Sequence, residues 1–148
     1  MSIADLHQEP SRSATSPMPL ERSLARTNEL LVGRTNTPAW WTALARNIDD
    51  VAGCVESHAV ACESVHRQLL PEHPRLAFRV RALERDHVEL IAEAAELRAV
   101  VAAATDQAAG LPIVLAATTE LVARLRGHDR RAGNLLHEAL RQDLGESG

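Results

Sequence analysis

Residue types that usually fill a protein core or its basic surface are scarce in this chain. Among 148 residues there is no tyrosine, no lysine, one phenylalanine and two tryptophans, and all sixteen basic residues are arginine. A core with so few aromatic rings must be built from leucine, valine and above all alanine, which is the best helix former. Small side chains also let helices approach one another closely. The composition therefore favours closely packed helices.

Other absences exclude or disfavour whole classes of protein. The formal net charge of −4 argues against a general nucleic-acid binder. The two cysteines make no disulfide framework and fit a reducing cytoplasm, where we expect the protein. No stretch approaches the roughly 20 apolar residues of a membrane span, and no secretion signal is visible. No phosphate loop, nucleophile elbow or zinc-finger spacing is present, so an enzyme is the least favoured interpretation.

The chain divides into an arm and a helical region. Residues 1–19 contain Pro10, Pro17 and Pro19 among serine and threonine, which predicts a disordered arm. Residues 20–145 show no strand-like alternation, and their apolar residues recur at helical spacing. This region is therefore predicted to be a single helical bundle.

The helix boundaries follow from capping and breaking signals. Thr37 followed by Pro38 is a strong start signal, because threonine caps a helix and proline suits its first position. Gly33 ends a short helix before it, and Thr105–Gly110 is a linker. The predicted helices span 20–32, 38–68, 75–104 and 112–143. We expect an all-α fold, an antiparallel up-down bundle with short loops.

Each long helix carries a seam of residues spaced alternately three and four apart, as in a heptad repeat. The first seam is Trp41, Leu44, Ile48, Val51, Val55, His58, Cys62 and Val65. The second is Leu76, Val80, Leu83, His87, Leu90, Ala94, Leu97 and Val101. The third is Val114, Thr118, Leu121, Leu125, His128, Ala132, Leu135 and Ala139. One histidine stands on each seam, among residues that are otherwise mostly apolar.

The three histidines are predicted to lie at one level of the bundle. His58 is thirteen residues before Pro71 and His87 is thirteen after Pro74, so both lie about 20 Å from the loop between their helices. Measured from the opposite loop, His87 and His128 are also about equally far along their helices. Each helix therefore places one imidazole in the same inward-facing layer.

A buried layer of imidazoles needs hydrogen-bond partners or a metal ion. Neutral imidazole is the commonest metal ligand, so His58, His87 and His128 are candidate ligands. Cys62, one turn after His58, could add a thiolate and favour zinc or iron, or it could be a small buried apolar residue. Glu63 could turn inward as a ligand or as a partner of a histidine, or it could be solvated.

The helical region contains three further histidines, which lie outside the predicted layer. His66, His73 and His137 lie near loops or off the seams, which predicts that they are surface residues. His66 lies two turns from His58 and is an additional candidate ligand.

Three segments resemble the hemerythrin-like (HHE cation-binding) proteins of actinobacteria. They are "SHAVACES", "PRLAFRVRALERDHVELIAEAAELRAVV" and "LVARLRGHDRRAGNLLHEALRQDLG", within residues 38–145. The resemblance implies an antiparallel four-helix bundle that holds a non-haem, often di-iron, centre. Members of that family bind or sense oxygen, nitric oxide or iron, or detoxify peroxide.

The ligand pattern of that family maps onto this chain only in part. His58, His87 and His128 match its histidines. Other ligand positions hold different residues, namely Cys62 (with Glu63 one residue later), Ile91 and Gly133. The resemblance therefore implies a reduced site, with fewer ligands than a di-iron centre needs.

Two functions remain open at this point. The first is a hemerythrin-like protein with a reduced metal site that binds or senses a metal or a small ligand such as oxygen or nitric oxide. Iron is the first choice of metal and zinc the second. The alternative is a metal-free helical module that forms a homo-oligomer or docks a partner protein. Neither hypothesis includes a nucleic acid or a membrane.

Overall fold

The computed structural model describes residues 20–104 and 110–146, and these form an all-α bundle. The helices are α1 (Leu20–Val32), α2 (Pro38–Leu69), α3 (Ala77–Ala104) and α4 (Leu111–Glu146), with a 3₁₀ turn at Pro74–Leu76 before α3. No strand occurs in these ranges. The four predicted helices are confirmed, with α4 three residues longer at its end than expected. The predicted arm at 1–19 and most of the linker at 105–110 lie outside the described residues.

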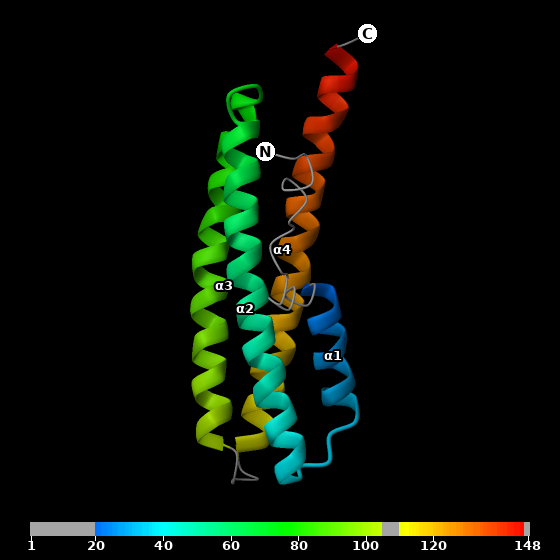
Figure 1. The fold of residues 1–148 in the computed structure, drawn as a ribbon, viewed down its shortest axis with the longest axis vertical. Coiled ribbons are helices and arrows are strands. Elements are labelled where there is room, and N and C mark those ends of the chain that lie inside the picture. The colour runs from blue at the N-terminus through cyan, green and yellow to red at the C-terminus, as the bar shows by residue number, and fades with distance from the viewer. Residues whose placement is uncertain (1–19, 105–109, 147–148) are drawn as a thin grey trace, which may run out of the picture.

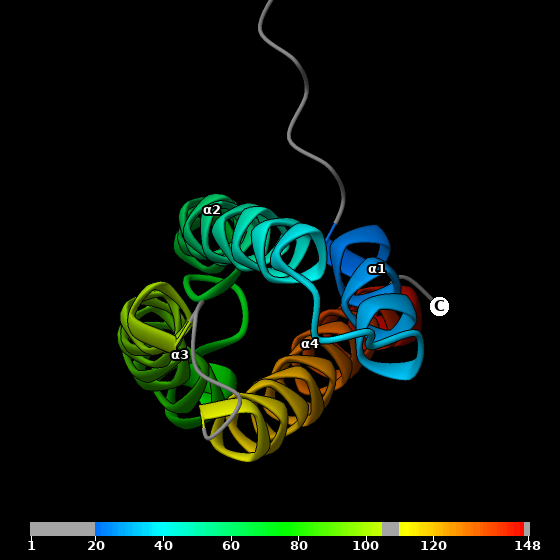
Figure 2. The same ribbon diagram turned by 90° about the horizontal axis from the view of Figure 1, so that it is seen from below.

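The helices run side by side along one long axis. In Figure 1, α2 rises from the end at which α1 stops, α3 returns along it, and α4 rises again. Viewed along the axis in Figure 2, the helices surround a common centre, with α1 between α2 and α4. With 13 residues, α1 is much shorter than α2 with 32 or α4 with 36. It therefore covers only part of the face between α2 and α4.

A buried polar network fixes α1 against α2. The Asn47 side-chain amide donates to the carbonyl oxygen of Ser23 at 3.1 Å, and the Thr27 hydroxyl lies 2.6 Å from Asn47 Oδ1. The Ser23 hydroxyl and the Cys54 sulfur are 3.5 Å apart. Because buried polar groups are costly when unpaired, these contacts hold α1 at one height along α2.

The start of α2 is built as the sequence predicts. The Thr37 hydroxyl accepts a hydrogen bond from the Trp40 backbone N–H at 3.2 Å, and Pro38 is the first helical residue. Both tryptophans that follow are buried. Trp40 donates its indole N–H to the Leu30 carbonyl and Trp41 donates to Asn36 Oδ1, each at 2.8 Å. The connection between α1 and α2 is therefore closed by two large side chains whose polar atoms are satisfied.

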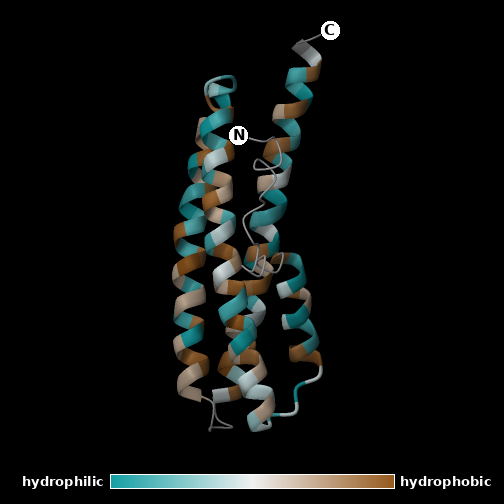
Figure 3. Cartoon of the chain, viewed as in Figure 1, coloured by the Kyte–Doolittle hydropathy of each residue, from teal (hydrophilic) through white to brown (hydrophobic). Residues whose placement is uncertain are grey.

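The predicted seams largely form the core. Every residue of the α3 seam is buried, and so is every residue of the α4 seam except Ala132, which is half-buried. Figure 3 shows apolar bands recurring along each helix. The end of the α2 seam was predicted wrongly, because Val65 is 41% exposed whereas His66 is 4% exposed. A straight helix of 3.6 residues per turn drifts by about 20° per heptad relative to a repeat of exactly seven residues. Between Trp41 and Val65 this drift moves the buried face to the next residue, His66.

Overpacking at Ala94 is expected to destabilise the protein. This residue is fully buried on α3, so Ala94→Leu must displace neighbouring side chains at a cost of about 1–3 kcal/mol. Ala92→Leu on the exposed face of the same helix is the matched control and should change stability by less than about 0.5 kcal/mol. Urea denaturation of the two variants measures the difference. Equal stabilities would mean that the core has room beside Ala94.

Candidate metal centre

Three helices bring His58, His87 and His128 together at one level. The ring centroids are 5.4 Å apart for His58 and His87, 5.5 Å for His58 and His128, and 4.5 Å for His87 and His128. His87 and His128 are buried, and His58 is half-buried. The rings meet edge to face, so their polar edges converge on a small volume between α2, α3 and α4. The predicted layer of imidazoles is present.

The nitrogens of this cluster are close enough for a shared ion and are short of hydrogen bonds. One nitrogen from each ring lies within 4.8 Å of the others. Among the described residues, the buried Nε2 atoms of His87 and His128 have no hydrogen-bond partner. Zinc–nitrogen bonds of about 2.0–2.1 Å place ligand nitrogens about 3.4 Å apart, so the rings would have to bring their nitrogens closer together to share one ion. The donor set therefore fits a metal ion.

An acidic residue that the sequence analysis did not single out orients one of these rings. Asp86 Oδ2 lies 3.4 Å from His128 Nδ1 and 2.8 Å from an Arg131 guanidinium nitrogen. A carboxylate at Nδ1 favours the tautomer with a proton there, which leaves Nε2 as a lone-pair donor. The only sequence signal for Asp86 was its place next to His87. The geometry of α3 turns the Asp86 side chain toward α4, where it meets His128 and Arg131.

The two non-histidine candidates are placed differently. The Cys62 sulfur lies 3.3 Å from His58 Nε2 and is half-buried at the edge of the cluster. Burial, with a smaller effect of Asp129, raises the pKa of the Cys62 thiol, so metal binding by this group would have to displace its proton. Glu63 is exposed, and its carboxylate lies 3.6 Å from the Arg67 guanidinium. It follows Cys62 by one residue, and one residue turns a helix by about 100°, so its side chain points away from the histidine layer.

A cleft of about 290 Å³ lies beside the cluster, between α2 and α4. His58, Cys62 and His66 line one wall, and Ala132 and Gly133 contribute to the other. An added Cβ at Gly133 would meet nothing within 4 Å, so this wall is open. The half-buried His58 and the thiol beside it are therefore the parts of the cluster that a small molecule reaches first.

The prediction that His66 is a surface residue was wrong. It is 4% exposed, and its Nδ1 lies 3.8 Å from Glu84 Oε1, beyond hydrogen-bond distance. Burial lowers the pKa of His66, although Glu84 opposes that effect. The same drift of the buried face of α2 that exposes Val65 places His66 in the interior.

The electrostatics of the cluster favour the neutral forms of His87 and His128. Burial, with smaller effects of the neighbouring His128 and His58 rings, lowers the pKa of His87 to about 4. Burial also lowers the pKa of His128, and the hydrogen bond that His128 donates to Asp86 opposes this effect. A low pKa leaves the nitrogen lone pairs free at neutral pH, which metal coordination requires.

A second group of metal-ligand residue types lies at the far end of the bundle, where Glu72, His73 and Asp143 meet. His73 is 4% exposed, so its prediction as a surface residue was wrong; His137 is exposed, as predicted. Both ring nitrogens of His73 have partners, Asp143 Oδ1 at 2.9 Å and Gln142 Oε1 at 3.2 Å. These contacts give the group a structural role, because they join the turn between α2 and α3 to α4.

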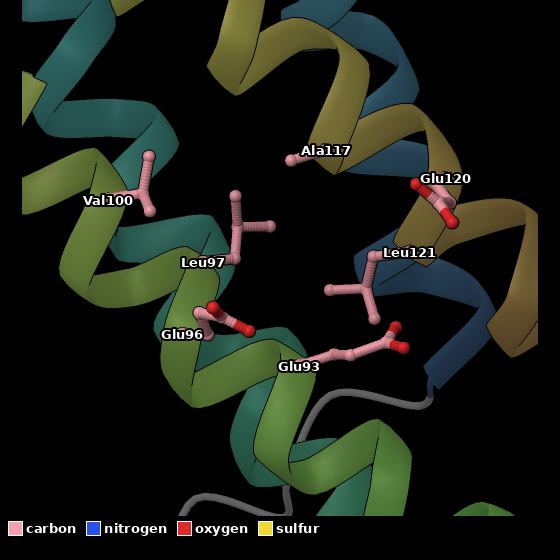
Figure 4. Close-up of a pocket in the computed structure, with 7 residues that line it drawn as sticks. All are labelled: Glu93, Glu96, Leu97, Val100, Ala117, Glu120 and Leu121. Atoms are coloured by element: carbon pink, nitrogen blue, oxygen red, sulfur yellow. The ribbon is translucent and has the colours of Figure 1, made fainter.

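A third feature is a pocket of about 300 Å³ between α3 and α4, near the end of the bundle where α3 stops. Figure 4 shows Leu97 and Leu121 on its floor with Glu93, Glu96 and Glu120 around them. Glu93 is ion-paired with Arg124. The pocket contains no histidine or cysteine and is separate from the three-histidine cluster.

Comparison of the chain with protein-family models, with curated proteins and with solved structures found no match in any of the three. Within the described residues, none of the helices has a stretch long and apolar enough to cross a membrane.

Proposed function

We propose that this chain is a metal-binding helical-bundle protein with a reduced, hemerythrin-like site formed by His58, His87 and His128. The observation that carries the proposal is the pair of buried Nε2 atoms without hydrogen-bond partners, on His87 and His128. Each unpaired buried atom costs about 1–3 kcal/mol. An ion shared by the three imidazoles would remove that cost. If the rings had only a structural role, the cost would remain.

The donor set supports iron or zinc as the metal. Three neutral imidazoles suit both, and a single adjacent thiol would favour zinc or iron over calcium or magnesium. Iron is the first choice because the helical segments resemble those of the iron-binding family. A bound metal with three protein ligands would supply free coordination positions for a small ligand such as oxygen or nitric oxide, so the proposed role is to bind or sense a metal or such a ligand.

The protein's own residues have separate tasks in this proposal. His87 and His128 would hold the ion from the buried side, and His58 would hold it from the side of the cleft. Asp86 keeps the proton of His128 on Nδ1, and the ion pair with Arg131 holds the Asp86 side chain in place. The apolar side chains on either side of the layer, such as Val55 and Leu90, keep water from the buried nitrogens.

Metal analysis of protein purified without a histidine tag tests the proposal. After anaerobic incubation with ferrous iron or with zinc, followed by gel filtration, we expect about one metal ion per chain by elemental analysis. Loading should also raise the melting temperature, because an ion that binds only the native state stabilises it. A chain that retains neither metal would contradict the proposal.

A metal-free interaction module is the alternative, and one observation favours it. Leu136, Leu140 and Leu144 are exposed along one side of α4, at 40%, 54% and 76%. Such a row is typical of a surface that another segment covers. If no metal is retained while the chain forms a concentration-dependent dimer, this second function replaces the first.

Loss of the charge on Asp86 should weaken metal binding without removing it. Asp86→Asn takes away the carboxylate that orients His128, and such changes cost about 10–100-fold in metal affinity. The matched control is Glu89→Gln, an exposed carboxylate on the same helix that pairs with Arg124. Competition with a chromophoric chelator measures both affinities. An affinity that is the same in the two variants would show that Asp86 has no role in the site.

A further inference from the structure

The face of the bundle that α1 covers continues past the level at which α1 begins. On α2, Asn47 contacts α1, and Val65 lies eighteen residues later, which is five full turns and returns to the same side of the helix. On α4, Val122 belongs to the core that includes Leu24 of α1, and Leu140 lies eighteen residues later. Both helices therefore repeat the covered face at a level that α1 does not reach (Figure 1).

This continued face is apolar and exposed. We call it the upper groove, and it consists of Cys62, Val65, Ala132, Gly133, Leu136 and Leu140. Val65, Leu136 and Leu140 are 41%, 40% and 54% exposed. Figure 3 shows apolar bands continuing along α4 beyond the level of α1. Apolar faces of this kind in a helical bundle are normally buried by another helix.

The interface of α1 shows what kind of segment fits between α2 and α4. A single helix fills the space there, with Leu24 and Leu30 buried in the core (Figure 2). On the edge of α1 that faces α4, the Glu21 carboxylate lies 3.5 Å from the Arg126 guanidinium. At this level the bundle therefore binds an amphipathic helix that has an acidic residue on its α4 side.

The basic edge of α4 continues along the upper groove. Arg130 and Arg141 are exposed, and they lie about 40° and 60° around the helix from Arg126, on the side away from Leu140. Arg130 forms no ion pair with any described residue. Asp129, which lines the cleft, lies toward α2 from this edge. The upper groove therefore repeats both properties of the α1 interface, an apolar floor and an arginine edge on α4.

We propose that the upper groove docks an amphipathic helix of a partner protein that has an acidic edge. The apolar face of the partner helix packs on Val65, Leu136 and Leu140. Its acidic edge lies beside Arg130 and Arg141, as Glu21 of α1 lies beside Arg126. Docking closes the cleft that leads to Cys62 and His58, and it requires no bound metal.

The dimensions of the upper groove favour a single helix as its occupant. Ser23 in the first turn of α1 contacts Cys54, and α2 ends fifteen residues later at Leu69. This stretch of α2 is about 22 Å long, which is the length of a helix of about fifteen residues. A second copy of the chain fits less well, because its described helices are already packed in a bundle and only the edge of one could enter a space that is one helix wide.

Binding of two synthetic peptides to the full-length, metal-free protein tests this proposal. Both peptides are amphipathic helices of about fifteen residues with leucine along one face; one has glutamate along an edge, and the other has lysine at the same positions. Fluorescence anisotropy at low salt should show one glutamate peptide bound per chain, about 10-fold or more tightly than the lysine peptide, because its charges complement the arginine edge. High salt should reduce the difference, since exposed charges are screened.

Reversing the charge of the arginine edge should reverse the preference between the peptides. Arg130→Glu/Arg141→Glu should bind the lysine peptide more tightly than the glutamate peptide. Arg81→Glu/Arg85→Glu makes the same change of charge at exposed positions on α3 and is the matched control, which should keep the wild-type preference. Equal affinities of wild type for the two peptides, or a preference that the first variant leaves unchanged, would overturn the proposal.

The apolar floor is tested separately. Leu140→Asp should abolish binding of both peptides, whereas Val88→Asp, at a position 70% exposed on α3, should not affect it. The glutamate peptide should also slow the alkylation of Cys62 by iodoacetamide, and slow reaction of the buried Cys54 reports that each variant is folded. A full-length chain that binds neither peptide would contradict a partner helix. A dimer in sedimentation experiments that Leu140→Asp dissociates would overturn the proposal in favour of a second copy.

Discussion

His87→Leu should abolish metal binding and leave the metal-free protein as stable as wild type or more stable. The imidazole is 6% exposed and its Nε2 atom has no hydrogen-bond partner among the described residues. Leucine has a similar volume and no polar atom, so it removes an unpaired buried group without leaving a large cavity. We expect the metal-free variant to be stabilised by about 0–2 kcal/mol, within the range for relieving such a group.

The same substitution should have the opposite effect in the presence of metal. Wild type should gain stability as metal is added, by about 2.7 kcal/mol when free metal is a hundred times the dissociation constant. His87→Leu should gain none. Urea denaturation with and without metal, combined with elemental analysis, measures both quantities. His137→Leu, which replaces an exposed histidine on α4, is the control and should behave like wild type.

The outcomes of this experiment separate the roles of the residue. Stoichiometric metal retained by His87→Leu would exclude His87 as a ligand. A large loss of stability in the metal-free variant would mean instead that the imidazole makes structural contacts that leucine cannot replace.

Acidification should destabilise the metal-free protein through the same cluster. Burial and the neighbouring imidazoles lower the pKa of His87 from 6.5 to about 4. Above pH 6.5 the ring is neutral in both the folded and the unfolded chain, so it contributes no pH dependence. Between pH 6.5 and pH 4 the unfolded chain binds a proton that the folded chain does not, so stability falls as the pH falls. The full effect of His87 is about 3 kcal/mol.

The difference between wild type and His87→Leu isolates this effect from the titration of carboxylates. Chemical denaturation at a series of pH values should give a steeper fall in stability for wild type than for the variant between pH 6.5 and pH 4. His128 should add a similar dependence, since burial lowers its pKa too. His137→Leu should follow the wild-type curve. Parallel curves for wild type and His87→Leu would show that His87 is not held neutral by its surroundings.

The all-α fold and most of the core could be read from local patterns. Heptad spacing is a local property, so the buried residues of α3 follow directly from the seam that begins at Leu76. The layer of histidines could also be read from the sequence, because the height along a helix is proportional to the number of residues counted from a loop. Thr37 and Pro38 mark the start of α2 for the same local reason.

Other features depend on how the helices face one another. Seam spacing alone puts Val65 inside, but the true helical period exposes it and buries His66. Asp86 is part of the site only because α3 turns its side chain toward α4. The seam spacing predicts which residues face inward, but it does not predict the contacts of residues beside the seam. His73 is buried by the end of α4, a contact between residues 70 positions apart in sequence.

The sequence by itself determined the helices, their inward faces and the common height of three imidazoles, because backbone periodicity and capping are properties of neighbouring residues. Only the tertiary structure decided that two Nε2 atoms of the cluster are buried without partners among the described residues, that Glu63 faces solvent and that α1 covers only part of the face between α2 and α4. Those outcomes depend on the rotation and height of each helix relative to the others. Packing sets both, through contacts such as Asn47 with Ser23 that no local pattern specifies.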